Sequence, residues 1–411
     1  MSTLTRRQLG GLLMAAAAKP LRLFGATSLD DTLSGGIQQR MIPAVTATVA
    51  TADHVLYTGA FGKRTAEGSA IQPDAIFRIA SMTKAVTTTA AMQLVEQGKL
   101  SLTGPASQYL PELGNLQVLH GFDSAGKPIL RPAKRQVALH HLMTHTSGFV
   151  YAVWDGDLTR YDKATGNSQP AGAVAPLTPL MFEPGTQWQY GTGIDWTGKI
   201  VEKVSGLTLE QYFQRNILEP LGMKDTTFIF PEAKLDRLAS SYRRQSDGAL
   251  KEEPVTTPVA PKEYNGGGGL FSTAPDYIRF TQMILRKGKS ADGKQILQPK
   301  TIAMMSANQI GSVNVHKMKS MDPTVSADVD MHPGAADKYT FGFLMNPTAY
   351  EGGRSAGSLA WAGVENTFYW IDPRRNVCAV IMMQFFPFVD AQAVGMLHDF
   401  EQAVYATLLK S

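Results

Sequence analysis

Residues 75–100 read AIFRIASMTKAVTTTAAMQLVEQGKL, and this stretch decides the predicted fold. An extended-looking run ends near Ser81, and after it apolar residues recur at helical spacing as far as Leu94 and Val95. Gly98 follows where such a helix would end, because glycine tolerates the left-handed conformation of a helix cap. We therefore predict a helix with one apolar face that begins near Ser81.

Ser81 and Lys84 stand three positions apart, on one face of this helix and one turn apart. A serine hydroxyl is a weak nucleophile that needs a neighbouring base, and a lysine amine in a buried site can act as that base. The helix N-terminus adds backbone N–H donors and the positive end of its dipole. A second Ser-x-x-Lys, Ser124 to Lys127, lies in a loop with no helix after it, and we assign it no role.

Length and composition exclude several classes of function. The chain has 411 residues, 44% of them hydrophobic, so we expect one compact unit of two subdomains with a large core. A net charge of +4 without a basic cluster does not favour nucleic-acid binding. A single cysteine, Cys378, excludes an intrachain disulfide. No run reaches the roughly 18 apolar residues of a membrane span, and no cluster has metal-ligand spacing, so we expect no integral membrane segment, metal or cofactor.

The first 25 residues leave two interpretations open. Arg6 and Arg7 precede a short apolar run, which is typical of a twin-arginine signal and would mean export to the periplasm. Lys19 and Arg22 shorten that run, so the alternative is an amphipathic N-terminus on a cytoplasmic enzyme.

Strand patterns stand at both ends of the chain and helical patterns in the middle. The strands are predicted at residues 44–50, 55–61, 340–345, 358–361, 366–371 and 377–385, with a final helix at 391–409. This order predicts an α+β fold: a central antiparallel sheet built from the N- and C-terminal segments, flanking helices and a mostly helical insertion. We expect an α/β domain at 26–80 and 276–411, a mainly helical domain at 81–275, and the active site at their junction.

Three segments are predicted to be loops. Residues 114–135 are polar, while residues 149–179 and 311–338 are long enough to be functional lids. Phe149 and Tyr151 open the second loop, and such aromatic side chains either wall a pocket or pack the loop down.

Two other patterns suggest sites but have structural explanations. His140, His141 and His145 lie in VALHHLMTHTSG, where the apolar neighbours predict a short buried helix. We expect structural histidines that hydrogen-bond the backbone. The glycine run at 265–269 has no following lysine, so we expect close backbone approach or tight turns rather than a phosphate loop.

Taken together, six stretches resemble the serine hydrolases that share the class C β-lactamase and penicillin-binding-protein fold. The nearest resemblance is to the family VIII carboxylesterases. The stretches are IFRIASMTKAVTTTAAMQLVEQGKL (76–100), VALHHLMTHTSGF (137–149), FEPGTQWQYG (182–191), ILEPLGMKDTTF (217–228), GGGGLFSTAPDY (266–277) and WAGVENTFYWIDP (361–373).

The resemblance implies a role for each matching residue. Ser81 would be the acylated nucleophile and Lys84 would take its proton. Tyr190 would complete one hydrogen-bonded set with them and pass a proton to the leaving alcohol. The backbone N–H groups of Ser81 and Val364 would form the oxyanion hole, where each donor is worth roughly 3 kcal/mol of transition-state stabilisation.

Two departures from the β-lactamase pattern favour neutral esters. Tyr190 is followed by Gly191 and Thr192 instead of x-Asn, and the third motif begins with Trp361 instead of lysine. A tryptophan offers an apolar wall and no positive charge for an anionic substrate. The substrate-binding residues implied or expected are Trp361, Ala362, Gly363, Phe149 and Tyr151.

We therefore expect a serine carboxylesterase that hydrolyses small or short-chain esters through an acyl-Ser81 intermediate. A β-lactamase or D-alanyl-D-alanine peptidase, an acyltransferase, and a non-catalytic binding domain remain alternatives. The expected partner is a small-molecule ester, and the sequence leaves the oligomeric state open.

Residues 353–357, GRSAG, also fit G-x-S-x-G, the nucleophile elbow of α/β-hydrolases. That elbow needs a strand before the serine and a helix after it. Here a strand-like run follows, so Ser355 is interpreted as a loop serine.

Overall fold

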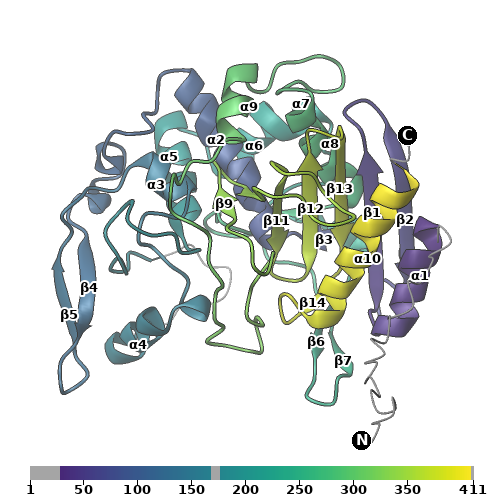
Figure 1. The fold of residues 1–411 in the computed structure, drawn as a ribbon, viewed down its shortest axis with the longest axis horizontal. Coiled ribbons are helices and arrows are strands. Elements are labelled where there is room, and N and C mark those ends of the chain that lie inside the picture. The colour runs from purple at the N-terminus through teal and green to yellow at the C-terminus, as the bar shows by residue number, and fades with distance from the viewer. Residues whose placement is uncertain (1–27, 168–175, 409–411) are drawn as a thin grey trace, which may run out of the picture.

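The computed structural model describes residues 28–167 and 176–408 (Figure 1). The twin-arginine pattern lies outside the described residues.

A seven-stranded antiparallel sheet joins the two ends of the chain, as predicted. Its order is β2-β1-β13-β12-β11-β10-β9, so the N-terminal β1 pairs with the C-terminal β13 (Figure 1). The strands are β1 (Ala44–Ala50), β2 (Val55–Gly62), β9 (Lys338–Tyr339), β10 (Leu344–Met345), β11 (Leu359–Gly363), β12 (Thr367–Asp372) and β13 (Val377–Met382). Both β1 and β13 are buried along their whole length, which places the core on both faces of the sheet.

Helices cover both faces of this sheet. Neighbouring side chains of a strand point to opposite faces. Trp370 of β12 meets Phe400 of α10 (Ala391–Thr407), whereas the adjacent Tyr369 meets Tyr277 of α8 (Ala274–Leu285). The N-terminal helix α1 (Leu29–Arg40) lies beside α10 at the β2 end of the sheet (Figure 1). The α+β prediction is therefore confirmed.

The helix after Ser81 differs from the prediction in one respect. The helix α2 (Thr83–Glu96) is buried from Thr83 to Leu94 and shows no exposed polar face over that length. It lies in the middle of the molecule, against α5 (Gly193–Ser205) and α6 (Leu209–Phe213), so every side meets protein. Two of its threonines donate to carbonyl oxygens, Thr87 Oγ1 to Gly266 at 2.6 Å and Thr89 Oγ1 to Ala85 at 2.9 Å, which satisfies these buried hydroxyls.

Two predicted loops contain regular structure. Residues 114–135 form a hairpin, β4 (Gln117–Phe122) and β5 (Pro128–Pro132), whose strand pattern the prolines and polar residues had hidden. Residues 149–179 include α4 (Gly156–Thr165). The remaining elements are β3 (Phe77–Arg78), α3 (Leu139–Met143), the π-helical turn Gln214–Leu218, α7 (Glu219–Leu221), β6 (Ser241–Arg244), β7 (Leu250–Glu253), β8 (Phe271–Ser272), α9 (Pro299–Met305), β14 (Phe385–Phe386) and 3-10 turns at Ala80–Met82, Ala106–Gln108, Pro111–Leu113, Ala152–Trp154 and Glu232–Arg237.

The division into an α/β domain and a helical domain stays a prediction. Within the described part of the chain, no helix is both long enough and apolar enough to cross a membrane.

Candidate active site

Ser81 lies on a strained turn between a strand and the central helix. The chain leaves β3 through Ile79, and Ala80 then adopts a positive φ of 42°, which costs energy in a residue with a Cβ. Strand β11 closes on this turn from the other side. A Cβ added at Gly363 would lie 2.4 Å from the Ile79 carbonyl oxygen, so only glycine allows this approach.

The Lys84 amine is aimed at the Ser81 hydroxyl. Lys84 is fully buried, and its Nζ lies 3.2 Å from Ser81 Oγ. Nζ also lies 3.0 Å from the Tyr151 hydroxyl and 2.5 Å from the Gly267 carbonyl oxygen. These contacts hold the amine at the Ser81 hydroxyl, so the structure brings together the two residues of the motif.

The glycine run supplies one of these contacts by close backbone approach, as expected. A Cβ added at Gly267 would lie 2.0 Å from an oxygen of Asp195, and one at Gly266 would lie 3.0 Å from the Gly198 Cα. Glycine therefore lets the 266–269 segment pack onto α5 and place the Gly267 carbonyl oxygen on Lys84.

Asp195 is a buried carboxylate that sequence reasoning missed. Its Oδ2 accepts a hydrogen bond from the Tyr151 hydroxyl at 3.1 Å. Burial raises the pKa of Asp195, while the Lys84 charge and hydrogen bonds from Tyr151 and Asn265 act to lower it. Burial, and next the Asp195 charge, raises the pKa of Tyr151 well above its ordinary value, so Tyr151 remains a neutral phenol. An aspartate within the apolar stretch GIDW was the only local signal.

Tyr190 lines the same cavity as Ser81 but differs from the expected arrangement. Its ring packs against Trp361 at 4.9 Å between centroids and against His145 at 4.7 Å. Lys84 Nζ lies 4.9 Å from the ring centroid. The buried Tyr190 hydroxyl has no hydrogen-bond partner among the described residues, so the predicted Ser-Lys-Tyr hydrogen-bonded set is not formed. Tyr151 takes the place on Lys84 that was expected of Tyr190.

The histidines bond the backbone, as expected. The Nδ1 atoms of His145 and His141 accept hydrogen bonds from Gly191 N–H at 3.3 Å and Ala138 N–H at 3.1 Å. Burial, reinforced by the Lys84 charge, lowers the pKa of His145 well below its ordinary value, so its ring is neutral. In the described ranges, no group of three or more His, Cys, Asp or Glu side chains is placed to hold a metal ion.

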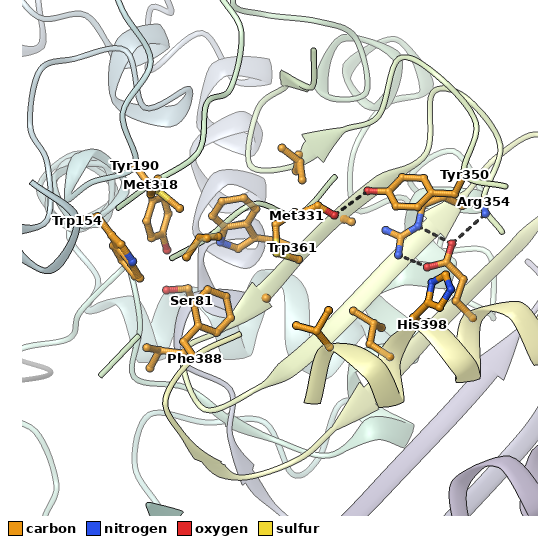
Figure 2. A pocket seen from close by; sticks show the side chains of 18 residues that line it. Ser81, Trp154, Tyr190, Met318, Met331, Tyr350, Arg354, Trp361, Phe388 and His398 are labelled. Atoms are coloured by element: carbon orange, nitrogen blue, oxygen red, sulfur yellow. Dashed lines mark hydrogen bonds and ion pairs between the residues drawn. The ribbon is translucent and has the colours of Figure 1, made fainter. Parts of the chain in front are cut away.

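A mostly apolar cavity opens onto Ser81 (Figure 2). It encloses about 810 Å³ of empty space, including its open mouth. The apolar side chains that line it are Trp154, Met318, Val329, Met331, Leu344, Ala360, Trp361, Ala362, Val364, Phe388, Val394 and Leu397. Three of them, Met318, Val329 and Met331, come from the predicted loop 311–338. Loop 311–338 is also hydrogen-bonded to the predicted loop 149–179, because Met321 N–H donates to the Val153 carbonyl oxygen.

Some of the expected site residues line this cavity, whereas Lys84, Gly363, Phe149 and Tyr151 do not. Trp361 and Ala362 line it, and Val364 follows Gly363 at the end of β11. Phe149 was expected in the wall, but it is fully buried and stacks on Trp196 at 5.8 Å.

Tyr151 is not among the lining residues either, because its hydroxyl is held by Lys84 and Asp195. The oxyanion role of the Ser81 and Val364 N–H groups stays a prediction, since the structure shows only that both residues face the same cavity.

The two other serine motifs, G-x-S-x-G at 353–357 and Ser-x-x-Lys at 124–127, lie in turns. Ser355 is followed by a turn and then by strand β11, and its N–H donates to Asp372 at 2.8 Å. The second Ser-x-x-Lys, Ser124 to Lys127, forms the tip of the β4–β5 hairpin. Neither serine begins a helix.

Comparison with known proteins places this arrangement in a family. The Beta-lactamase family model matches residues 29–401. Monacolin J acid methylbutanoyltransferase from Aspergillus terreus is 32% identical, with 95% of this chain and 97% of that protein covered. Lovastatin esterase from Penicillium rubens is also 32% identical, with 87% and 92% covered. The LovD6 mutant of simvastatin synthase from Aspergillus terreus superimposes with a TM-score of 0.80 at 31% identity, with 93% and 95% covered. The chain therefore belongs to the beta-lactamase family, among members that carry out serine hydrolase and acyltransferase chemistry.

Proposed function

We propose that this protein is a serine acyltransferase that moves an acyl group from an ester or thioester donor to the hydroxyl of an apolar alcohol. The observation that carries the proposal is the 3.2 Å contact between Lys84 Nζ and Ser81 Oγ at the end of a large apolar cavity. A nucleophile with its base supplies the acyl-enzyme, and apolar walls suit an organic acceptor better than water.

The reaction has two symmetrical halves. In the first half, Ser81 Oγ attacks the donor carbonyl carbon, and Lys84 takes the Ser81 proton. The carbonyl oxygen, now an anion, faces the N–H groups of Ser81 and Val364. The donor alcohol or thiol leaves with a proton that Lys84 gives up and the Tyr190 hydroxyl delivers. In the second half, the acceptor hydroxyl attacks the acyl carbon and gives its proton through the Tyr190 hydroxyl to Lys84, which returns a proton to Ser81 Oγ as the bond between Ser81 Oγ and the acyl carbon breaks.

Tyr190 is the group that delivers protons on the cavity side. Its hydroxyl is buried, faces the same cavity as Ser81 and has no partner among the described residues. That leaves it available to the oxygen of the leaving or attacking alcohol. Lys84, by contrast, is shared with Tyr151 and Gly267 on the protein side.

The relatives favour acyl transfer over the plain carboxylesterase that the sequence suggested. The relative with 97% of its length covered is named a methylbutanoyltransferase, so a short branched acyl group is the first donor to try. Hydrolysis remains the second candidate, because lovastatin esterase has the same level of identity. Trp361 packs against Tyr190 where a β-lactamase would place a lysine, which disfavours anionic β-lactams.

Product analysis separates these activities. We would supply p-nitrophenyl 2-methylbutyrate with alcohols of increasing size and measure the new ester and the free acid by chromatography. We expect the ester to exceed the acid with a large apolar alcohol, and both to vanish in Ser81→Ala. Acid alone with every alcohol would make the protein an esterase, and faster turnover of nitrocefin would make it a β-lactamase.

A further inference from the structure

The cavity at Ser81 has a second polar end that the proposed chemistry does not use. Figure 2 shows Ser81 and Tyr190 at one end and Tyr350, Arg354 and His398 at the other, with apolar side chains between them. A few polar groups in a mostly apolar cavity are the usual means of fixing a ligand's orientation.

Arg354 is a buried cation that Glu401 holds in place. Its Nε lies 2.9 Å from Glu401 Oε1 and its Nη2 lies 2.5 Å from Oε2. The Arg354 backbone N–H adds a third contact to Oε1 at 2.9 Å. The side chains are 8% and 6% exposed, and the guanidinium lies over the rings of Tyr350 and Trp370 at 4.8 and 5.3 Å. The orientation of the guanidinium is therefore fixed before any ligand arrives.

This arrangement leaves one nitrogen of Arg354 unused. Glu401 occupies Nε and Nη2, while Nη1 has no hydrogen-bond partner among the described residues. The Tyr350 hydroxyl is already bonded to the Met331 carbonyl at 3.3 Å. His398 lies on the exposed side of α10, where water can hydrate it. Arg354 lines the cavity, and its Nη1 is not among the buried atoms without a partner, so this N–H is accessible to a ligand oxygen.

The charge balance decides what kind of oxygen fits. Burial alone would raise the pKa of Glu401, but the Arg354 charge and hydrogen bonds outweigh it and lower that pKa, so the pair stays ionised. The pair carries no net charge. The Glu401 carboxylate would repel a ligand carboxylate placed beside Arg354. A neutral carbonyl or hydroxyl oxygen can accept a hydrogen bond from the Arg354 Nη1–H group without that repulsion.

The register of strand β11 gives the distance between the two ends of the cavity. Gly363 lies against Ile79 beside Ser81, and Ala360 of the same strand pairs with Trp370, under the Arg354 guanidinium. Since three residues of strand span about 10 Å, the Arg354 end lies on the order of 10 Å from the nucleophile.

We propose that Arg354, positioned by Glu401, binds a neutral carbonyl or hydroxyl oxygen of an elongated apolar substrate, remote from the carbonyl group that Ser81 attacks. Arg354 would thus determine which substrates are selected without taking part in the bond-making steps. This inference rests on the proposed function for the position of the reacting carbonyl.

Binding to Ser81→Ala protein tests the proposal without any turnover. The ligands are matched pairs of fatty methyl esters and of alkyl acetates, in which one member carries an oxo group at successive carbons and the other carries only methylene groups. In one of the two series, calorimetry should show one oxo-substituted ligand that binds about tenfold more tightly than its unsubstituted partner. This difference is the size expected of a hydrogen bond from a charged donor.

The variant must remove the pair without leaving a buried charge. Breaking one partner of a buried ion pair is strongly destabilising, while replacing both by apolar residues is often tolerated. In Arg354→Met/Glu401→Leu on the Ser81→Ala background, we expect the oxo preference to disappear and hydrocarbon binding to persist. Leu397→Ala, which removes part of the apolar wall, should weaken both members of each pair equally.

Two outcomes would overturn the proposal. One is that no oxo position in either series binds more tightly than its hydrocarbon. The other is that the preference survives in the folded double variant. Because neither measurement needs catalysis, the absence of Ser81-dependent acyl transfer in the wild type would refute the proposed function and leave the binding result to be judged by itself.

Discussion

The Lys84 Nζ atom lies 3.0 Å from the hydroxyl of Tyr151. This contact gives the base a protein-side partner, because the same hydroxyl donates to Asp195 at 3.1 Å. Tyr190, which faces Ser81 across the cavity, contacts Lys84 only through its ring, at 4.9 Å. The two tyrosines therefore differ in their contacts with Lys84, and we propose that Tyr151 positions Lys84 while Tyr190 exchanges protons with the reacting oxygens.

Removing each hydroxyl separately should reveal this difference. Tyr190→Phe should lower kcat for p-nitrophenyl butyrate by roughly 100-fold or more, as expected for loss of a general acid-base group. Tyr151→Phe leaves Lys84 with the Ser81 and Gly267 contacts and should cost only about tenfold in kcat, the size of the one hydrogen bond that Lys84 loses. A larger loss of kcat in Tyr151→Phe than in Tyr190→Phe would reverse the assignment.

Gly363 should be irreplaceable, because β11 presses on the turn that carries Ser81. In Gly363→Ala the new Cβ would meet Ile79 O at 2.4 Å and Thr367 Oγ1 at 2.3 Å. The strand must shift, which should cost about 1–3 kcal/mol of stability by overpacking. It should also cost about 100-fold in kcat, if the Val364 N–H moves off the oxyanion.

A glycine in open surroundings provides the control. In Gly35→Ala, within α1, the new Cβ meets only Gln39 Nε2 at 3.7 Å, so kcat and the thermal unfolding midpoint should not fall. Wild-type kcat in Gly363→Ala would show that the close approach of β11 does not matter for catalysis.

The free energy of unfolding should decrease as the pH falls from neutral to mildly acidic values, and His141 should contribute to that decrease. Burial, followed by the charges of His140 and Arg135, lowers the pKa of His141 from 6.5 to about 4. Between these values the unfolded chain binds a proton that the folded chain does not, so stability is lost as pH falls from 6.5 toward 4. Protonation would also remove the acceptor that His141 Nδ1 offers to Ala138 N–H.

Urea unfolding across this range, in wild type and His141→Asn, measures the effect. Asparagine keeps an acceptor oxygen but does not titrate in this range. The variant should reduce the slope of stability against pH by less than ~1.4 kcal/mol per pH unit, the value for one whole proton. Equal slopes in the two proteins would show that His141 titrates alike folded and unfolded.

Ser355 should be dispensable for catalysis. It lies in a turn before β11, and its N–H is tied to Asp372. Ser355→Ala should therefore keep kcat within about twofold of wild type, as is usual for a substitution that removes no catalytic contact. Loss of activity in a folded Ser355→Ala protein, judged by circular dichroism, would revive the G-x-S-x-G interpretation.

The sheet and the nucleophile were predictable because both leave local signals. The strand patterns at the two ends of the chain, like the turn before Ser81, depend only on residues that are neighbours in the sequence. The three-residue spacing of Ser81 and Lys84 brings their side chains together within one helical turn. The burial of α2 on every side was not predictable in the same way. An apolar stripe in the sequence shows that one face of a helix is buried, but not how many elements pack around the helix.

The rest of the site depends on contacts between distant segments. Phe149 and Tyr151 lie in irregular backbone, where no period fixes the direction of a side chain, so only the structure shows that one packs on Trp196 and the other bonds Lys84. Likewise, Arg354 and Glu401 are far apart in sequence and meet only because α10 crosses the sheet.

The most direct test of the central claim is the identity of the acylated residue. After rapid quenching of a reaction with p-nitrophenyl 2-methylbutyrate, peptide mass spectrometry should find the acyl group on Ser81. The label should be absent in Ser81→Ala, and it should decay faster in wild type when a large apolar alcohol is added. An acyl group on Ser355, or undiminished turnover by Ser81→Ala, would contradict the account.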